Sequence, residues 1–221
     1  MEPTSMALGQ NRRARARPAG ALQPWVIPAL VVFAALPLTF GILRILQLAG
    51  ISDVMPAAPA ASTIPLVTHI VGAILYALLG ALQFAPRIRA RWPGWHRASG
   101  RLLVVAGIFV AISALWLSIA HSTTTFAGVI LLSSRLLFAS TMLTSIVLGL
   151  AAILRRDIAR HRAWMMRAYA IGLGASTQMV AMMLVEIVAG PPGELGRSIV
   201  LSAAWVINLA VAEWRIHRAR R

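Results

Sequence analysis

The chain has 221 residues, of which 59% are hydrophobic and 12% are charged, and its mean hydropathy is +0.77. Soluble domains carry about a quarter charged residues, so this composition excludes an ordinary soluble protein and indicates an integral membrane protein. The formal net charge of +15 comes from arginine alone among the basic residues, and the absence of cysteine excludes disulfides, thiolate metal sites and thiol catalysis.

Six apolar stretches follow one another along the chain, each long enough for a membrane helix of about 20 residues. They cover residues 25–49, 64–85, 102–121, 126–153, 164–189 and 195–214. Each stretch must be helical, because lipid offers no partner for an unpaired backbone amide. The sequence therefore predicts an all-α integral membrane protein with six transmembrane helices in a membrane domain at 24–214, between basic tails at 1–23 and 215–221.

The first apolar stretch has a second interpretation as part of a signal peptide. A basic segment precedes it, and the small residues "APAAS" follow it. Its length of about 25 residues exceeds the 7–15 residues of a signal-peptide core, so we expect a retained first helix. Arg12 and Arg13 form a twin-arginine pair, but the surrounding "NRRARARPAG" lacks the other features of an export signal.

The arginines gather on one side of the predicted bundle. Four precede the first helix, five lie between the second and third, five lie at the fourth-to-fifth connection and four lie at the end. The opposite connections contain a single arginine, Arg197. By the positive-inside rule, both termini are cytoplasmic in a bacterial inner membrane. The basic excess predicts this topology and contact with anionic lipids, and it does not indicate nucleic-acid binding, because no aromatic-interleaved basic domain is present.

An internal repeat relates the central helices at an offset of about 65 residues. The sequence "HRA" at 96–98 falls on "HRA" at 161–163, and His121 falls on Glu186. The two matching hairpins cover residues 64–121 and 126–189. Because both hairpins enter the membrane from the same side, we predict a parallel repeat whose second to fifth helices form a four-helix core. Chance matching of apolar sequences is the alternative explanation.

Two groups of polar side chains lie at membrane depth or at helix ends. The outer group holds ionisable side chains, which are costly in lipid and usually face a bundle interior, a cavity or each other. Its members are His69, His121, Arg135 and Glu186. The inner group lies at the cytoplasmic starts of the third and fifth helices. Its members are His96, His161, Arg97, Arg101, Arg162 and Arg167.

Several kinds of chemistry fit these groups. A b-type haem needs two axial ligands, usually neutral imidazoles, and cations near its propionates, and the inner group supplies both. In the outer group, His69 and His121 could ligate a haem, or the two histidines with Glu186 would suit a non-haem metal. A proton or anion pathway with Arg135 paired to Glu186 is a further possibility. The structural alternative is a set of interhelical hydrogen bonds, ion pairs and interfacial anchors.

The motifs "HRASGR" and "RHRAWMMRAY", which follow a helix that carries His69, resemble a bacterial family of multi-pass membrane proteins defined only as a domain of unknown function. This resemblance covers roughly residues 60–190 and implies a shared membrane domain without an activity. A weaker resemblance is to the ascorbate-reducing diheme b-type cytochromes, which are six-helix proteins with a four-helix haem-binding core. It implies a haem between His96 and His161, and it leaves a second haem without a ligand, because Arg135 stands at that place on the fourth helix.

These observations lead to the hypothesis of electron transfer through a b-type haem, which exchanges electrons with a quinone or a small reductant. In this hypothesis His96 and His161 ligate the haem iron. The propionate partners are Arg97, Arg101, Arg162 and Arg167, and the outer group forms a site for substrate or a second metal. Two alternatives are a small transporter or ligand-binding membrane protein that uses the outer group as its site, and a structural subunit of a membrane complex.

Overall fold

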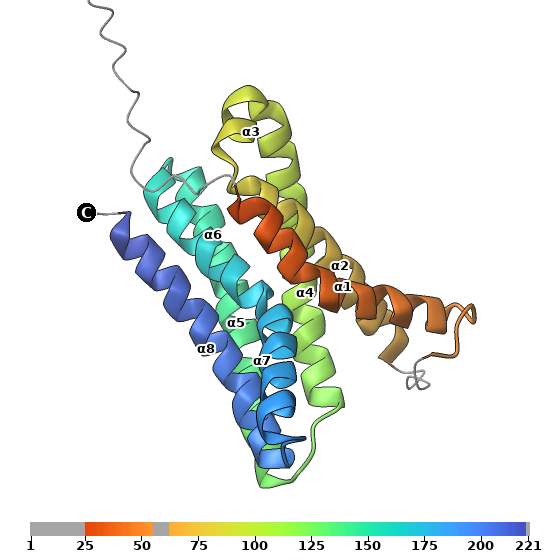
Figure 1. Cartoon of the computed structure of the whole chain (residues 1–221). Coiled ribbons are helices and arrows are strands. Elements are labelled where there is room, and N and C mark those ends of the chain that lie inside the picture. The colour runs from red at the N-terminus through yellow and green to blue at the C-terminus, as the bar shows by residue number, and fades with distance from the viewer. Residues whose placement is uncertain (1–24, 55–61, 220–221) are drawn as a thin grey trace, which may run out of the picture.

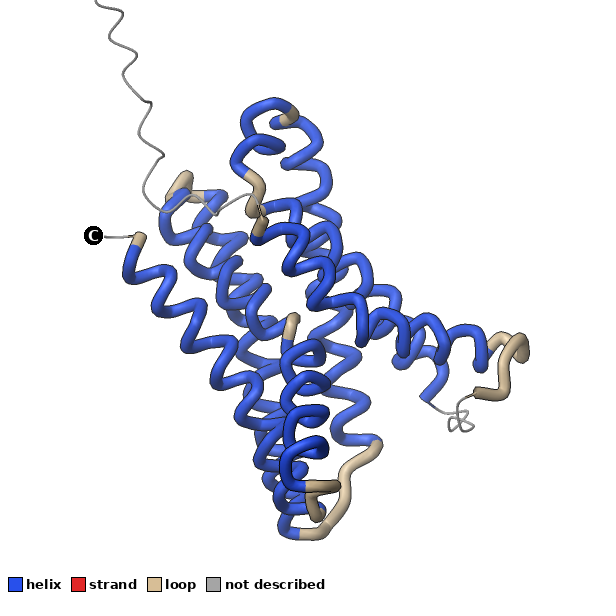
Figure 2. The backbone as a smooth tube through the Cα atoms, in the orientation of Figure 1, coloured by secondary structure: helices blue, strands red, loops and turns tan. Residues whose placement is uncertain are grey.

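The computed structural model describes residues 25–54 and 62–219, and within these ranges the chain folds into helices with no strand (Figure 1). Figure 2 shows the short loops that join them. The helices are α1 (Val26–Leu48), α2 (Thr63–Gln83), α3 (Pro86–Arg91), α4 (Pro93–Ala120), α5 (Phe126–Leu154), α6 (Ile158–Gly172), α7 (Gly174–Ala189) and α8 (Glu194–Arg218). The predicted tail at 1–23 lies outside the described residues, whereas the other predicted tail begins as a continuation of α8.

Five of the described helices, namely α1, α2, α4, α5 and α8, are long and apolar enough to cross a membrane. A sixth span results if α6 and α7 are taken together, since these two helices meet at a bend of 43°. The all-α prediction is confirmed for the described residues, with five or six candidate spans. The third predicted span, 102–121, is only part of α4, which begins at Pro93 because proline at the start of a helix needs no backbone donor.

The hydrophobic core lies between α2, α4, α5 and α6. α2 packs on α4 and α5 packs on α6, and contacts between α4 and α5 join the two pairs. α8 packs against α5, α6 and α7, while α1 lies outside against α2 and α7 (Figure 1). The buried cluster comprises Tyr76, Ala81, Leu103, Val110, Phe138, Met142, Ile146, Ala168, Tyr169, Ile171 and Leu173. The core thus comes from α2, α4, α5 and α6, whereas α7, the second half of the predicted fifth span, packs against α8 and α1. The origin of the predicted four-helix core by duplication stays a prediction.

Glycines let the core helices approach closely. A Cβ atom on Gly107 would lie 2.7 Å from the ring of Tyr76, and a Cβ atom on Gly80 would run into the ring of Tyr169. The Tyr169 hydroxyl donates a hydrogen bond of 2.9 Å to the carbonyl of Ala77, so its ring is held in place. These glycines therefore serve helix packing, for which small residues are the usual device in membranes.

Replacing Gly80 by alanine should destabilise the protein, because the added methyl group overpacks the core and costs about 1–3 kcal/mol. The thermal unfolding midpoint of the protein in detergent measures this loss. The control is Gly94→Ala near the start of α4, where an added Cβ meets no atom within 4 Å. An equal midpoint for the two variants would contradict the packing role of Gly80.

Polar side chains of α7 and α8 form hydrogen bonds around the bend between α6 and α7. Asn208 Nδ2 of α8 donates to the carbonyl of Ala170 at 3.0 Å, and the Thr177 hydroxyl donates to Asn208 Oδ1 at 2.7 Å. Gln178 Nε2 donates to a backbone carbonyl of α8 at 2.9 Å. A broken helix is tolerated at membrane depth where neighbouring groups satisfy the freed backbone atoms. The fifth predicted span, residues 164–189, is therefore two helices and not one.

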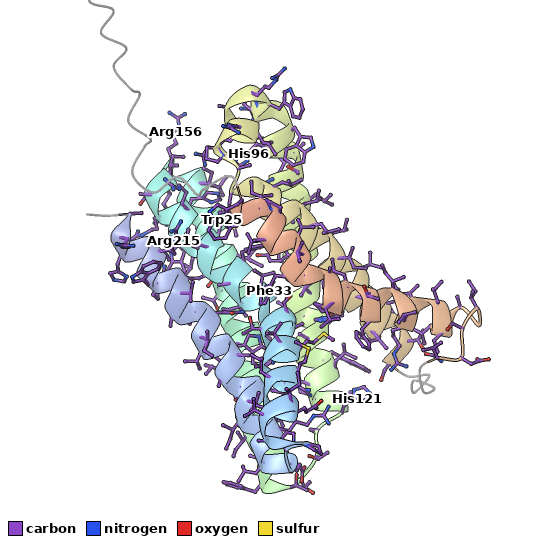
Figure 3. All side chains as sticks on the ribbon, viewed as in Figure 1. Trp25, Phe33, His96, His121, Arg156 and Arg215 are labelled. Carbon is purple, nitrogen blue, oxygen red and sulfur yellow. The ribbon has the colours of Figure 1, made fainter. Side chains whose placement is uncertain are left out.

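The two ends of the bundle differ in charge. The α5–α6 connection, α3 and the C-terminal end of α8 lie at one end (Figure 1), which we call the arginine-rich end. The α4–α5 and α7–α8 connections lie at the opposite, arginine-poor end (Figure 1). His96 and His121 mark the two ends of α4 (Figure 3). His96 of the inner group and His121 of the outer group thus lie at different ends of the bundle.

Candidate functional site

Arg167, an expected propionate partner, is already paired with a carboxylate. Its Nε donates to Glu213 Oε1 of α8, and its second guanidinium nitrogen donates to Glu213 Oε2 at 2.9 Å. The guanidinium carbon also lies 4.5 Å from the centre of the Trp164 ring. The side chains of the pair are only 19% and 32% exposed. Sequence reasoning missed this pair because Glu213 lies in the last helix, outside the internal repeat.

The two inner histidines lie at the arginine-rich end, on α4 and α6. His161 Nδ1 lies 2.8 Å from the carbonyl of Gly149 and must be the donor there, so Nε2 is left as an acceptor in the neutral ring. His96 Nδ1 is buried and has no hydrogen-bond partner among the described residues. The remaining expected partners are exposed at this end: Arg97, Arg101 and Arg162.

Aromatic side chains fill the interior of the four-helix core. The ring of Tyr169 lies 5.1 Å from that of Phe84 and 6.0 Å from that of Tyr76, between ring centres. Tyr76 lies on α2, Phe84 directly follows α2, and Tyr169 lies on α6, so their rings occupy the space that a cofactor bound in the core would need. The interior of the described bundle is therefore packed with protein side chains.

Each outer histidine makes a hydrogen bond between the α2 region and the α4 region. His69 is on α2 and contacts α4, whereas His121 follows α4 and contacts Ser62, the residue before α2. His69 Nδ1 lies 3.2 Å from the carbonyl of Val110 and 3.2 Å from the hydroxyl of Ser113. His121 Nδ1 donates to the carbonyl of Leu117 at 3.0 Å, so the Ser62 hydroxyl donates to His121 Nε2 at 3.1 Å. Within the described chain, no group of three or more His, Asp or Glu side chains could hold a metal ion. The metal site considered for the two histidines with Glu186 is thus not formed.

Glu186 lies apart from the rest of the outer group. It is exposed on α7, and no ion pair joins it to Arg135 among the described residues, so the structure does not show the pairing considered from the sequence. The physical reason is the helical repeat: a step of four residues turns the side-chain direction by about 40° beyond a full turn. Gln178 contacts α8, and Glu186 lies two steps of four residues further along α7. The side chain of Glu186 therefore points about 80° away from the direction of Gln178.

A pocket of about 170 Å³ opens at the arginine-poor end. It lies between the end of α4, the first turns of α5 and the start of α8. Its lining residues are Ser118, His121, Ser122, Thr123, Gly128, Leu131, Leu132, Arg135, Glu194, Arg197 and Ser198. Two members of the outer group, His121 and Arg135, therefore share one pocket, whereas His69 and Glu186 do not line it.

The charges in this pocket do not cancel. Arg135 is half-buried on α5, and Arg197, near the start of α8, is exposed and lines the same pocket. In the part of the chain that the structure describes, neither arginine forms a side-chain hydrogen bond or an ion pair. The Glu194 carboxylate instead accepts a 2.6 Å hydrogen bond from the hydroxyl of Thr125, the N-cap residue of α5. Two arginines thus face one glutamate in the pocket.

Sequence reasoning placed Arg197 in a connection and did not include it, or Glu194, in a site. One signal was present: Arg197 is the single arginine in the connections of the arginine-poor side, where the positive-inside rule disfavours it. An arginine at a position that the topology disfavours indicates a local role, and the structure places Arg197 in the lining of the pocket.

A family model described as predicted membrane protein (DUF2306) matches residues 66–216. The match covers more than half of the chain and includes every residue that lines the pocket. No curated protein and no solved structure matches the chain.

Proposed function

The chain belongs to the DUF2306 family of predicted membrane proteins, in agreement with the resemblance carried by its two HR motifs, and we propose that it binds a small anion in the pocket at the arginine-poor end. One observation carries the proposal: Arg135 and Arg197 line the same pocket without a carboxylate partner among the described residues. The function is that of a ligand-binding or transporting protein of the membrane.

The energetics of charge in a membrane favour a ligand here. An ionised side chain at membrane depth is costly, and such groups usually pair with another charge or mark a substrate site. Two like charges that line one pocket repel each other, and an anion between Arg135 and Arg197 would add two attractions. Guanidinium groups also bind carboxylate and phosphate oxygens through two parallel N–H donors. The pair is therefore suited to an oxyanion.

The rest of the pocket supplies the remaining contacts. The hydroxyl groups of Ser122 and Thr123 lie at its exposed rim, while Ser118 and Ser198 are buried, with 5% and 3% of their surface exposed. Hydroxyl groups donate or accept hydrogen bonds as a ligand requires. The pocket thus combines a fixed positive charge with adaptable polar groups.

Acetate is a suitable first probe of this function. In dilute HEPES buffer, added acetate should raise the thermal unfolding midpoint of the detergent-purified protein in a saturable manner, because a ligand that binds the folded state stabilises it. Arg162→Gln, an exposed arginine at the opposite end, should respond like the wild type. A midpoint that does not change with acetate, formate or chloride would contradict the proposal.

The orientation expected from the sequence fits this function. With the arginine-rich end in the cytoplasm of a bacterial cell, against anionic lipids, the pocket opens to the outside. Arg135 belongs to the second predicted hairpin and Arg197 lies outside both, so the predicted repeat does not duplicate the pocket. A cysteine introduced at Thr123, at the pocket rim, should then react with a membrane-impermeant maleimide in intact cells.

A second candidate function is the binding of a b-type haem at the arginine-rich end. The observation that favours it is the pair of imidazoles: Nε2 of His161 is left as an acceptor, and His96 Nδ1 is buried without a partner in the described chain. Against it, Tyr76 and Tyr169 occupy the core interior. A reduced-minus-oxidised absorption spectrum decides: sharp α and β bands support the haem, and with it a quinone or small reductant as the electron partner, and a flat spectrum excludes it.

A further inference from the structure

We infer that Glu194 restricts the pocket to singly charged anions, so that the ligand class is a small monoanion such as a short-chain carboxylate. The inference rests on the proposed anion-binding function and names its ligand. It follows from the charges that face the pocket, from the fixed position of the Glu194 carboxylate and from the size and lining of the cavity.

The pocket carries one positive charge in excess. Arg135 contributes from α5 and Arg197 from α8, and Glu194 contributes the single negative charge. His121 lines the pocket at the end of α4, where its Nδ1 donates to the carbonyl of Leu117 and its Nε2 lies 3.1 Å from the hydroxyl of Ser62. The α4–α5 connection adds only uncharged side chains to the lining. A monoanion would therefore neutralise the pocket, whereas a dianion would leave a negative charge beside a carboxylate.

Glu194 is held in the wall of the pocket and is not engaged by either arginine. Its carboxylate accepts the short hydrogen bond from Thr125, and no ion pair joins it to Arg135 or Arg197 among the described residues. Glu194 is also the first residue of α8, where the partial positive charge of the helix start favours an ionised carboxylate. The negative charge therefore stays in the pocket while the arginines are free to hold a ligand.

The size and the lining of the cavity restrict the class of ligand further. A cavity of about 150 Å³ holds a molecule of the size of benzene, so a pocket of about 170 Å³ suits a ligand of about six non-hydrogen atoms. Leu131 and Leu132 of α5 add an apolar surface to the polar lining. A carboxylate oriented toward the arginines with a short alkyl group against these leucines matches both surfaces.

Methanesulfonate and sulfate test the inference, because they have nearly the same shape and differ by one charge. Each is titrated into the full-length protein in detergent at pH 8 in a low, fixed concentration of Tris chloride, with calorimetry as the measurement. The wild type should bind methanesulfonate at least tenfold more tightly than sulfate. Glu194→Gln, whose amide oxygen can still accept from Thr125, should reduce this preference at least tenfold, mainly through tighter sulfate binding.

Two controls keep the outcomes distinct. Glu186→Gln removes an exposed carboxylate near the same end but outside the pocket and should keep the wild-type preference, as should the charge-conserving Glu194→Asp. If the wild type binds sulfate as tightly as methanesulfonate, or Glu194→Gln keeps the preference, the inference is overturned while anion binding stands. If the wild type binds neither these anions nor acetate, the proposed function itself fails. Should Glu194→Gln not fold, the wild-type comparison alone decides.

Discussion

Acetate should bind the Arg135→Gln variant ten to a hundred times more weakly than the wild type. A hydrogen bond that involves a charged group contributes about 1.5–3 kcal/mol, and about 1.4 kcal/mol corresponds to a tenfold change in affinity. Without ligand, the variant should unfold at the same temperature as the wild type or higher, because it lacks a half-buried cation that has no carboxylate partner among the described residues. Calorimetric titration and thermal unfolding measure the two effects.

This combination separates a ligand site from a structural role. A structural arginine would lower the unfolding temperature when it is removed, with or without acetate present. Arg162→Gln makes the same charge change at the arginine-rich end and should leave acetate binding within about twofold of the wild type, since charges at that distance are screened by salt. Unchanged acetate affinity in Arg135→Gln would rule out this arginine as a ligand-binding residue.

Loss of one member of the Arg167–Glu213 pair should be the most destabilising single change at the arginine-rich end. Removing one partner of a buried ion pair costs about 3–5 kcal/mol, because the other charge is left unpaired. Since Glu213 is 32% exposed, we expect about 1–3 kcal/mol for Arg167→Gln or Glu213→Gln. The double variant should lose less than the sum of the two single losses.

Chemical or thermal unfolding of the four proteins gives this coupling directly. Strictly additive losses would show that the bidentate hydrogen bonds do not stabilise the fold. In that case Arg167 would again be available to bind a ligand at the arginine-rich end. The predicted coupling instead assigns Arg167 to the attachment of α8 to α6.

The helical fold was predictable from the sequence because the length of an apolar stretch is enough to indicate a membrane helix. The details that were not predictable depend on neighbouring helices. α4 begins at Pro93, within an arginine-rich segment that apolar length alone assigns to a loop. The break at Leu173 stands within a continuous apolar stretch, and it is stable because Asn208 of another helix satisfies a freed carbonyl. Hydropathy alone indicates neither the start of α4 nor the break at Leu173.

The candidate site was predictable only in part, for a similar reason. His121 and Arg135 stood out as ionisable residues near the outer side, and both line the pocket. Glu194 and Arg197 belong to the same pocket, but only the packing of the start of α8 beside α5 brings them there. Glu186 was placed in the outer group as an ionisable residue that matches His121 in the predicted repeat, but it does not line the pocket. Sequence patterns therefore identified single residues, but the packing of the helices determines which residues share a site.

The most direct measurement of the anion site is an anomalous difference map at the arsenic absorption edge, from crystals grown with cacodylate at pH 8. Cacodylate is a monoanion of five non-hydrogen atoms at this pH, within the size that the pocket accepts. The account predicts an arsenic peak between the guanidinium groups of Arg135 and Arg197, and its loss in crystals of Arg135→Gln. An ordered pocket without an arsenic peak in wild-type crystals would contradict it.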